Sequence, residues 1–275
     1  MGFFLFGMLG NCGTSSYDKK KVPRFFMPIS QTFGKISRLW DLGKAKEKIV
    51  KLKVKNIKTM NEIGKLIDKF ISLRKNNTHR DASFDLCFYY FQTNKEHVAE
   101  KDYLEKSCLY LWSYLSSWGM LRGSSYLLTK SPAFLIPLIE HLQSSDVWGI
   151  DVNNYTEENI AKILKEYEEI KNALIDKETK KEPTCTLVTK IMLGVYGNIP
   201  AFDHFFKKGF DVGSVNKESL NKIKNFYDKH KDEFNQEIKV LDFENKETEL
   251  RYTKAKLVDM YGFQKGLNKE QIKNE

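Results

Sequence analysis

The chain has 275 residues, of which 41% are hydrophobic and 29% are charged, and its formal net charge is +9. This length suffices for one large globular domain that needs no disulfide or metal to stabilise it. No apolar run approaches the ~18 residues that a membrane-spanning helix requires. The composition therefore argues against a small disulfide-bonded scaffold, a transmembrane protein, a collagen-like fibre and a fully disordered chain.

Positive charge is concentrated near the N-terminus. Residues 19–58 contain thirteen lysines and arginines against two acidic residues, whereas residues 59–275 contain 32 basic and 33 acidic residues. We therefore divide the chain into a basic N-terminal arm, residues 1–59, and a body, residues 60–275. A basic arm on a nearly neutral body predicts an accessory contact with nucleic-acid phosphate or an anionic membrane. A solvated, partly disordered tail without a partner is the alternative.

The N-terminal segment and the cysteines favour a cytoplasmic setting. The segment MGFFLFGMLGNCG has no basic residue before its apolar run and no cleavage-site pattern after it, unlike a secretory signal. The cysteines are too few for a disulfide framework and too far apart for a C-x-x-C pair. They are Cys12, Cys87, Cys108 and Cys185.

Beyond residue 60, apolar residues recur at spacings of three and four, which is typical of amphipathic helices. Expected N-caps are Ser83, Ser131 and Thr156, and Gly119 and Gly262 are expected to end helices. The expected helices cover approximately residues 63–71, 83–91, 102–118, 131–143, 156–174, 183–195, 220–227 and 250–261.

No repeat of fixed length joins these segments, and strands do not alternate with helices. We therefore predict an all-α fold, an irregular globular body of about eight to ten helices with a basic N-terminal arm. A minor strand pair around residues 240–243 or 51–55 is left open.

Common catalytic and metal-binding motifs are absent from the sequence. It contains no phosphate-binding loop G-x-x-x-x-G-K-[ST], no G-x-G-x-x-G, no G-x-S-x-G and no H-E-x-x-H. The five histidines are scattered at spacings that place no two ligands on one helical face. Cys87 and Cys108 lie in apolar stripes, where packed thiols are expected. We therefore predict no metal and no cofactor.

One candidate binding segment is SSWGMLRGSS, residues 116–125. Arg122 lies between two glycines, beside Ser124 and Ser125. Glycines allow close approach of a ligand to the backbone, and an arginine with two hydroxyls can bind phosphate or carboxylate. The alternative is an ordinary helix corner in which Arg122 binds helix C-terminal carbonyls or an acid such as Asp85.

A second candidate is TLVTKIMLGVYGNIPAFDHFF, residues 186–206, in which an apolar helix leads through Pro200 to Asp203 at the start of another helix. The structural interpretation of Asp203 is an N-cap. The arrangement Ile199-Pro200-Ala201-Phe202-Asp203 also resembles the helix-hairpin-helix DNA glycosylase superfamily, in which such a turn carries a catalytic aspartate. It differs from that turn by one residue inserted between the proline and the acid.

This resemblance implies a base-excising enzyme. Asp203 would be catalytic, Trp118 or Tyr196 would stack on an extruded base, and Arg122, with Ser124 and Ser125, would contact that base or a phosphate. Lysines would hold the DNA backbone. These are Lys190, Lys207 and Lys208. The family's Schiff-base lysine would precede Lys190, which favours a monofunctional enzyme.

The sequence thus predicts a DNA glycosylase-like hydrolase acting on double-stranded DNA, in repair or in defence against phage. SFDLCFYYF and SSWGMLRGSS are also similar to segments of a bacterial all-helical family, a resemblance that implies no mechanism. One alternative is a non-catalytic module that binds nucleic acid, lipid or another partner through the basic arm. Another is a small-molecule enzyme that uses the Arg122 segment.

Overall fold

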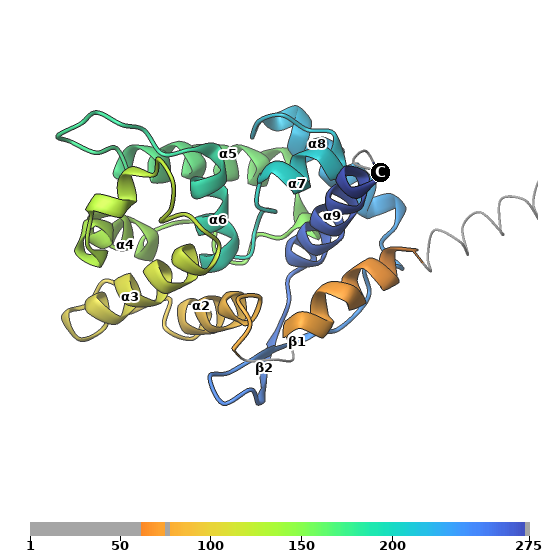
Figure 1. Cartoon of the computed structure of the whole chain (residues 1–275), viewed down its shortest axis with the longest axis horizontal. Coiled ribbons are helices and arrows are strands. Elements are labelled where there is room, and N and C mark those ends of the chain that lie inside the picture. The colour runs from red at the N-terminus through yellow and green to blue at the C-terminus, as the bar shows by residue number, and fades with distance from the viewer. Residues whose placement is uncertain (1–61, 75–77, 273–275) are drawn as a thin grey trace, which may run out of the picture. The chain divides into compact units, whose positions relative to one another are not determined.

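The computed structural model describes residues 62–74 and 78–272. The basic arm and the strand candidate at residues 51–55 lie outside the described residues. Residues 62–74 are helical, and the α-helices that follow are α2 (Ala82–Thr93), α3 (Lys101–Ser117), α4 (Ile136–Gln143), α5 (Glu157–Ala173), α6 (Cys185–Val195), α7 (His204–Phe210), α8 (Lys217–Lys229) and α9 (Lys254–Gln271). Short 3₁₀ turns are η1 (Tyr126–Thr129), η2 (Pro132–Leu135) and η3 (Val152–Asn154). The described part of the chain is therefore mostly helical, as predicted (Figure 1).

A two-stranded hairpin is the one sheet among the described residues. Strand β1 (Lys239–Leu241) pairs antiparallel with β2 (Glu247–Arg251), so that Lys239 lies opposite Arg251 and Leu241 opposite Glu247. Of the two strand positions that the sequence left open, the one near residues 240–243 is occupied by β1. The helix predicted for residues 250–261 is wrong at both ends, because residue 250 belongs to β2 and α9 continues well past Gly262.

Gly262 lies inside α9 and does not end it. Together with Gly209 of α7 and Gly266 of α9, it allows the backbones of the two helices to touch. The two helices lie side by side (Figure 1). A Cβ atom added to Gly266 would lie 1.8 Å from the Phe205 carbonyl oxygen, and one added to Gly209 would lie 2.1 Å from that of Gly262. Packing between helices, rather than the end of a helix, accounts for these glycines.

The observed helix starts agree with the expected positions to different degrees. Asp81 is the N-cap of α2, and the Ser83 hydroxyl donates to the Arg80 carbonyl. Ser131 precedes η2 without a side-chain capping bond, and α4 follows that turn. Thr156 caps α5 as expected, by accepting a hydrogen bond from Asn159 N. Pro183 precedes α6, which Thr184 caps.

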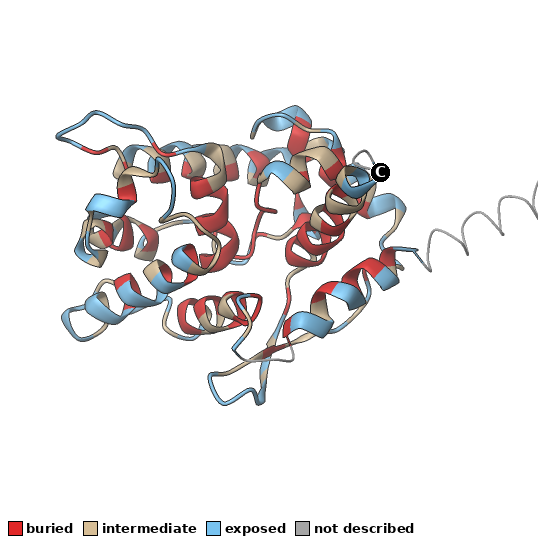
Figure 2. Cartoon of the chain, viewed as in Figure 1, coloured by how far each residue is buried: buried red, intermediate tan, exposed pale blue. Residues whose placement is uncertain are grey.

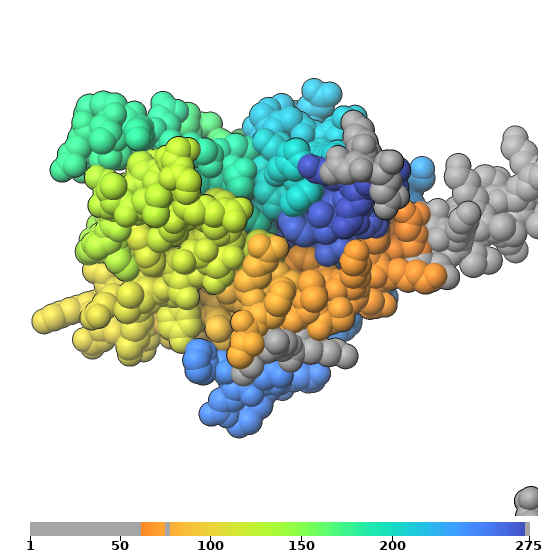
Figure 3. All heavy atoms as spheres, viewed as in Figure 1, coloured from red at the N-terminus to blue at the C-terminus, as the bar shows by residue number. Residues whose placement is uncertain are grey.

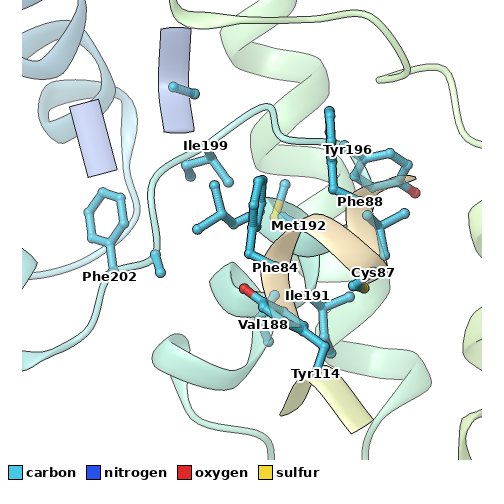
Figure 4. Packing of buried hydrophobic residues seen from close by; sticks show 14 of the residues in the cluster. Phe84, Cys87, Phe88, Tyr114, Val188, Ile191, Met192, Tyr196, Ile199 and Phe202 are labelled. Carbon is cyan, nitrogen blue, oxygen red and sulfur yellow. The ribbon is translucent and has the colours of Figure 1, made fainter. Parts of the chain in front are cut away.

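Helix α6 lies at the centre of the core. Its residues from Leu187 to Val195 are all buried, and Figure 2 shows it almost entirely in the colour of buried residues. Aromatic rings from α2 and α3 pack against it, among them Phe84 and Tyr114, as the close view in Figure 4 shows. Full burial of each large apolar side chain contributes about 1.5–3 kcal/mol. A functional group on α6 therefore has a rigid support.

The helix of residues 62–74 packs against the end of the chain. Figure 3 shows its atoms against those of α9, and the rings of Phe70 and Phe263 meet edge to face at 6.2 Å. Arg74 binds the buried carboxylate of Asp85 at 2.8 Å, and Asp85 also accepts a hydrogen bond from Leu241 N. Burial raises the pKa of Asp85, against the effect of Arg74. This network joins the helix of residues 62–74 to α2 and β1.

Candidate functional site

Asp203 lies where the segment after α6 enters α7. Its Oδ1 accepts a hydrogen bond from Phe206 N at 2.9 Å, so the N-cap interpretation is confirmed. Its Oδ2 accepts a hydrogen bond from Lys190 Nζ at 3.1 Å, and 15% of the side chain is exposed. The carboxylate therefore has a partner beyond the local backbone and remains partly open to solvent.

Lys190 places a positive charge inside the protein. Its side chain is 5% exposed, and its ammonium lies 4.3 Å from the centre of the Trp118 ring as well as against Asp203. A buried ammonium needs such partners, because removing it from water is costly. Lys190 is thus enclosed in an ion pair, not presented to a DNA backbone as predicted, because α6 is buried on nearly all sides.

Hydrogen bonds from two helices fix the segment that carries Asp203. The Phe202 N–H donates to the Thr189 hydroxyl at 2.9 Å, and the Thr186 hydroxyl donates to the Phe202 carbonyl. From α9, Asp259 accepts the Ala201 N–H at 3.0 Å. The position of the carboxylate is therefore set before any ligand arrives, which is the geometry that an active site requires.

Trp118 contributes to the packing around this ion pair. Its ring is stacked with Phe70 at a centroid distance of 6.3 Å, and the Arg80 guanidinium lies 5.2 Å from its centre. Its Nε1 is buried and has no hydrogen-bond partner among the described residues. The ring on which a base was predicted to stack is therefore already in contact with Phe70, Lys190 and Arg80.

Arg122, Ser124 and Ser125 line one cavity of about 350 Å³, as the sequence grouped them. Neither alternative partner of the Arg122 side chain is found: Asp85 binds Arg74, and the Arg122 guanidinium makes no hydrogen bond or ion pair with any described residue. Leu187 of α6 also lines the cavity. Because Leu187 and Lys190 are three residues apart, they lie on the same face of α6. The cavity and the Lys190–Asp203 pair therefore follow one another along that face.

The structure separates Tyr196 from these groups. Tyr196 is 2% exposed, its hydroxyl donates to Glu166 at 2.6 Å, and the Trp148 ring meets it edge to face. The predicted stacking on an extruded base is not available to a ring at this position, because it is part of the core. We therefore leave Tyr196 out of the candidate site.

Of the two lysines that follow Asp203, one is paired. The Lys208 ammonium lies 3.2 Å from Glu270, whereas the side chain of Lys207 has no partner among the described residues. Lys207 is therefore the better candidate for a contact with a DNA phosphate.

Glu166, which accepts the hydrogen bond from Tyr196, also binds His141, and this second contact predicts that the stability of the fold depends on pH. His141 Nε2 lies 3.1 Å from Glu166, and this hydrogen bond raises the pKa of His141, with burial opposing it and Glu169 adding to it. A raised histidine pKa stabilises the fold below the unfolded value of about 6.5 and loses that effect as pH rises through the folded value.

We therefore expect the free energy of unfolding to decrease between about pH 6 and pH 8, and His141→Gln to reduce this decrease. Urea unfolding of both proteins at the two pH values measures it. An unchanged pH dependence in the variant would contradict the assignment.

Within residues 62–74 and 78–272, no group of three histidine, cysteine or acidic side chains is placed to hold a metal ion. No helix in that part of the chain is long and apolar enough to cross a membrane. Cys87 is buried, and burial raises the pKa of its thiol.

Compared with protein-family models, curated proteins and solved structures, the chain has no match in any of the three.

Proposed function

We propose that the protein is a DNA glycosylase-like enzyme that hydrolyses an N-glycosidic bond, with Asp203 as the catalytic carboxylate. The observation that carries this proposal is the pairing of Asp203, 15% exposed, with the 5% exposed ammonium of Lys190. Asp203 thus combines an N-cap, a buried counter-charge and a segment held by hydrogen bonds from two helices. This fixed position of a partly exposed carboxylate supports a functional role.

The chemistry follows from the charge that develops during excision. As the bond between C1′ and the base nitrogen breaks, the sugar becomes oxocarbenium-like and positive, and a nearby carboxylate stabilises it. The oxygen of a water molecule then bonds to C1′, and that water releases one proton. The base departs with a proton on the nitrogen that had been bonded to C1′. Asp203 would stabilise the sugar and orient the water, and Lys190 would hold the carboxylate.

Limited access to Asp203 is consistent with a nucleotide drawn out of the helix. A base that remains stacked in a duplex does not reach a partly buried carboxylate, whereas an extruded nucleotide does. Extrusion costs a few kcal/mol, least for damaged or mismatched bases. A modified base is therefore the favoured substrate, in repair or in defence against phage.

The direct test is an excision assay. Purified protein is incubated with plain duplexes and with duplexes that carry oxidised, alkylated or deaminated bases, and abasic sites are then cleaved with alkali. We expect alkali-dependent strand cleavage at one class of modified base and none before the alkali step. Absence of abasic sites on every duplex would leave the non-catalytic binding module as the better hypothesis.

The basic arm is expected to add nonspecific affinity for DNA. Neutralisation of phosphates by lysine and arginine makes binding steeply salt-dependent, with a slope of about −0.9 per contact. Deletion of residues 1–59 is therefore expected to weaken duplex binding and to flatten the dependence of log K on log salt. Fluorescence anisotropy between ~50 and ~200 mM salt measures this. An unchanged slope would assign the arm no part in DNA binding.

A further inference from the structure

The Arg122 cavity carries chemistry that excision at Asp203 does not use. It is formed by the corner after α3, the beginning of η1 and the segment that enters α6. Its volume is about 350 Å³, within the range of small-molecule sites. The lining residues are Gly119, Met120, Arg122, Ser124, Ser125, Tyr126, Lys181, Glu182, Thr184 and Leu187.

The polar groups of this cavity are mainly unused donors. The side chains of Arg122, Lys181 and Ser124 make no hydrogen bond or ion pair with any described residue. The acidic group of the lining, Glu182, lies 3.0 Å from the Lys171 ammonium, which balances its charge. Two positive charges therefore face the cavity without a protein counter-charge. This arrangement favours an anion.

The walls that carry these donors are held in place. A Cβ atom at Gly119, whose φ is +73°, would lie 2.6 Å from Arg122 Nε, so the arginine side chain packs directly on the glycine. On the opposite wall, Asp176 N donates to the Lys181 carbonyl at 3.0 Å. The Thr179 hydroxyl and then Lys130 lower the pKa of Asp176 to about 2, which keeps this turn charged and bonded. The cavity is therefore formed without a ligand.

The size and charge of the cavity together indicate the ligand class. Two cations match the two charges of a phosphate monoester, and an arginine fork with neighbouring hydroxyl donors matches its terminal oxygens. A phosphate group alone leaves most of 350 Å³ empty. Met120, Leu187 and the Tyr126 ring supply an apolar surface for the remainder. We propose that this cavity binds a phosphate monoester the size of a nucleotide, independently of any reaction at Asp203.

The test uses the full chain and calorimetric titration with inorganic phosphate, a nucleoside 5′-monophosphate, the matching nucleoside, and a short oligonucleotide that has only internal phosphodiesters. We expect the monophosphate to bind more tightly than the nucleoside or the oligonucleotide. Arg122→Gln and Lys181→Gln are each expected to weaken this binding by about 10- to 100-fold, as for hydrogen bonds to charged groups. Arg122→Lys should restore only part of it, because lysine lacks the planar fork.

Glu182→Gln is the matched control on the same wall. It removes a negative charge from the lining and is expected to tighten binding by about two- to threefold. Monophosphate binding that is unchanged in Arg122→Gln, or tighter binding of the oligonucleotide than of the monophosphate, would overturn the proposal. Asp203→Asn is expected to leave monophosphate affinity unchanged. If the unaltered protein binds the monophosphate but excises no base, only the glycosylase proposal is contradicted. If it excises a base but does not bind the monophosphate, only the present proposal is contradicted.

Discussion

Asp203→Asn is expected to abolish base excision and also to destabilise the protein. Loss of the negative charge removes the stabilisation of a positive sugar, for which about 10²-fold or more in rate is the expected cost. Asparagine still caps α7, because its side-chain oxygen can accept the Phe206 N–H. Lys190, however, is 5% exposed and loses its counter-charge, which costs up to about 3 kcal/mol.

A double variant separates the two effects. In Lys190→Met with Asp203→Asn, the buried ammonium is replaced by an apolar chain of similar length that can pack on Trp118. We expect urea unfolding to show stability returning toward that of the unaltered protein, while single-turnover excision remains absent. Excision retained in Asp203→Asn would move the catalytic role to another residue. Excision restored in the double variant would show that the single change acted only through folding.

Local patterns sufficed for much of the fold. The stripe of apolar residues from Leu104 to Leu115 predicted α3 almost to its ends, and Thr156 marked the start of α5 correctly. Both features depend on neighbours within four residues. Gly262 could not be interpreted in this way, because the reason for a glycine there is the approach of α7, whose residues are more than fifty positions away in the sequence.

In the candidate site too, features carried by neighbouring residues could be predicted, and contacts from distant residues could not. Residue type identified Asp203 and Arg122, since a carboxylate at a helix start and an arginine between glycines are visible in the sequence. The groups that position Asp203 gave no such signal: Thr189 binds Phe202 from 13 residues away, and Asp259 binds Ala201 from 58 residues away. The resemblance alone placed Tyr196 in the site, and because aromatic residue type carries no information on burial, its position in the core could not be predicted.

Among the glycine-to-alanine changes in the described part of the chain, Gly266→Ala is expected to have the largest effect on stability. The added Cβ would lie 1.8 Å from the Phe205 carbonyl oxygen and 2.6 Å from its carbonyl carbon. Because both are backbone atoms, no side chain can rotate away, and α7 must separate from α9. Overpacking of this kind costs about 3 kcal/mol or more, well above the gain of up to about 1 kcal/mol in helix propensity.

Two other glycine-to-alanine changes serve as controls, because at these positions a Cβ atom has room. Gly213→Ala meets no atom within 4 Å and is expected to leave the free energy of unfolding nearly unchanged. Gly64→Ala, in the helix of residues 62–74, has its nearest neighbour at 3.6 Å and is expected to stabilise by up to about 1 kcal/mol. Urea unfolding measures all three variants.

Since Asp203 begins the helix that Gly266→Ala displaces, excision should also fall below the level set by the folded fraction. A Gly266→Ala protein as stable as Gly213→Ala would contradict the backbone contact between α7 and α9.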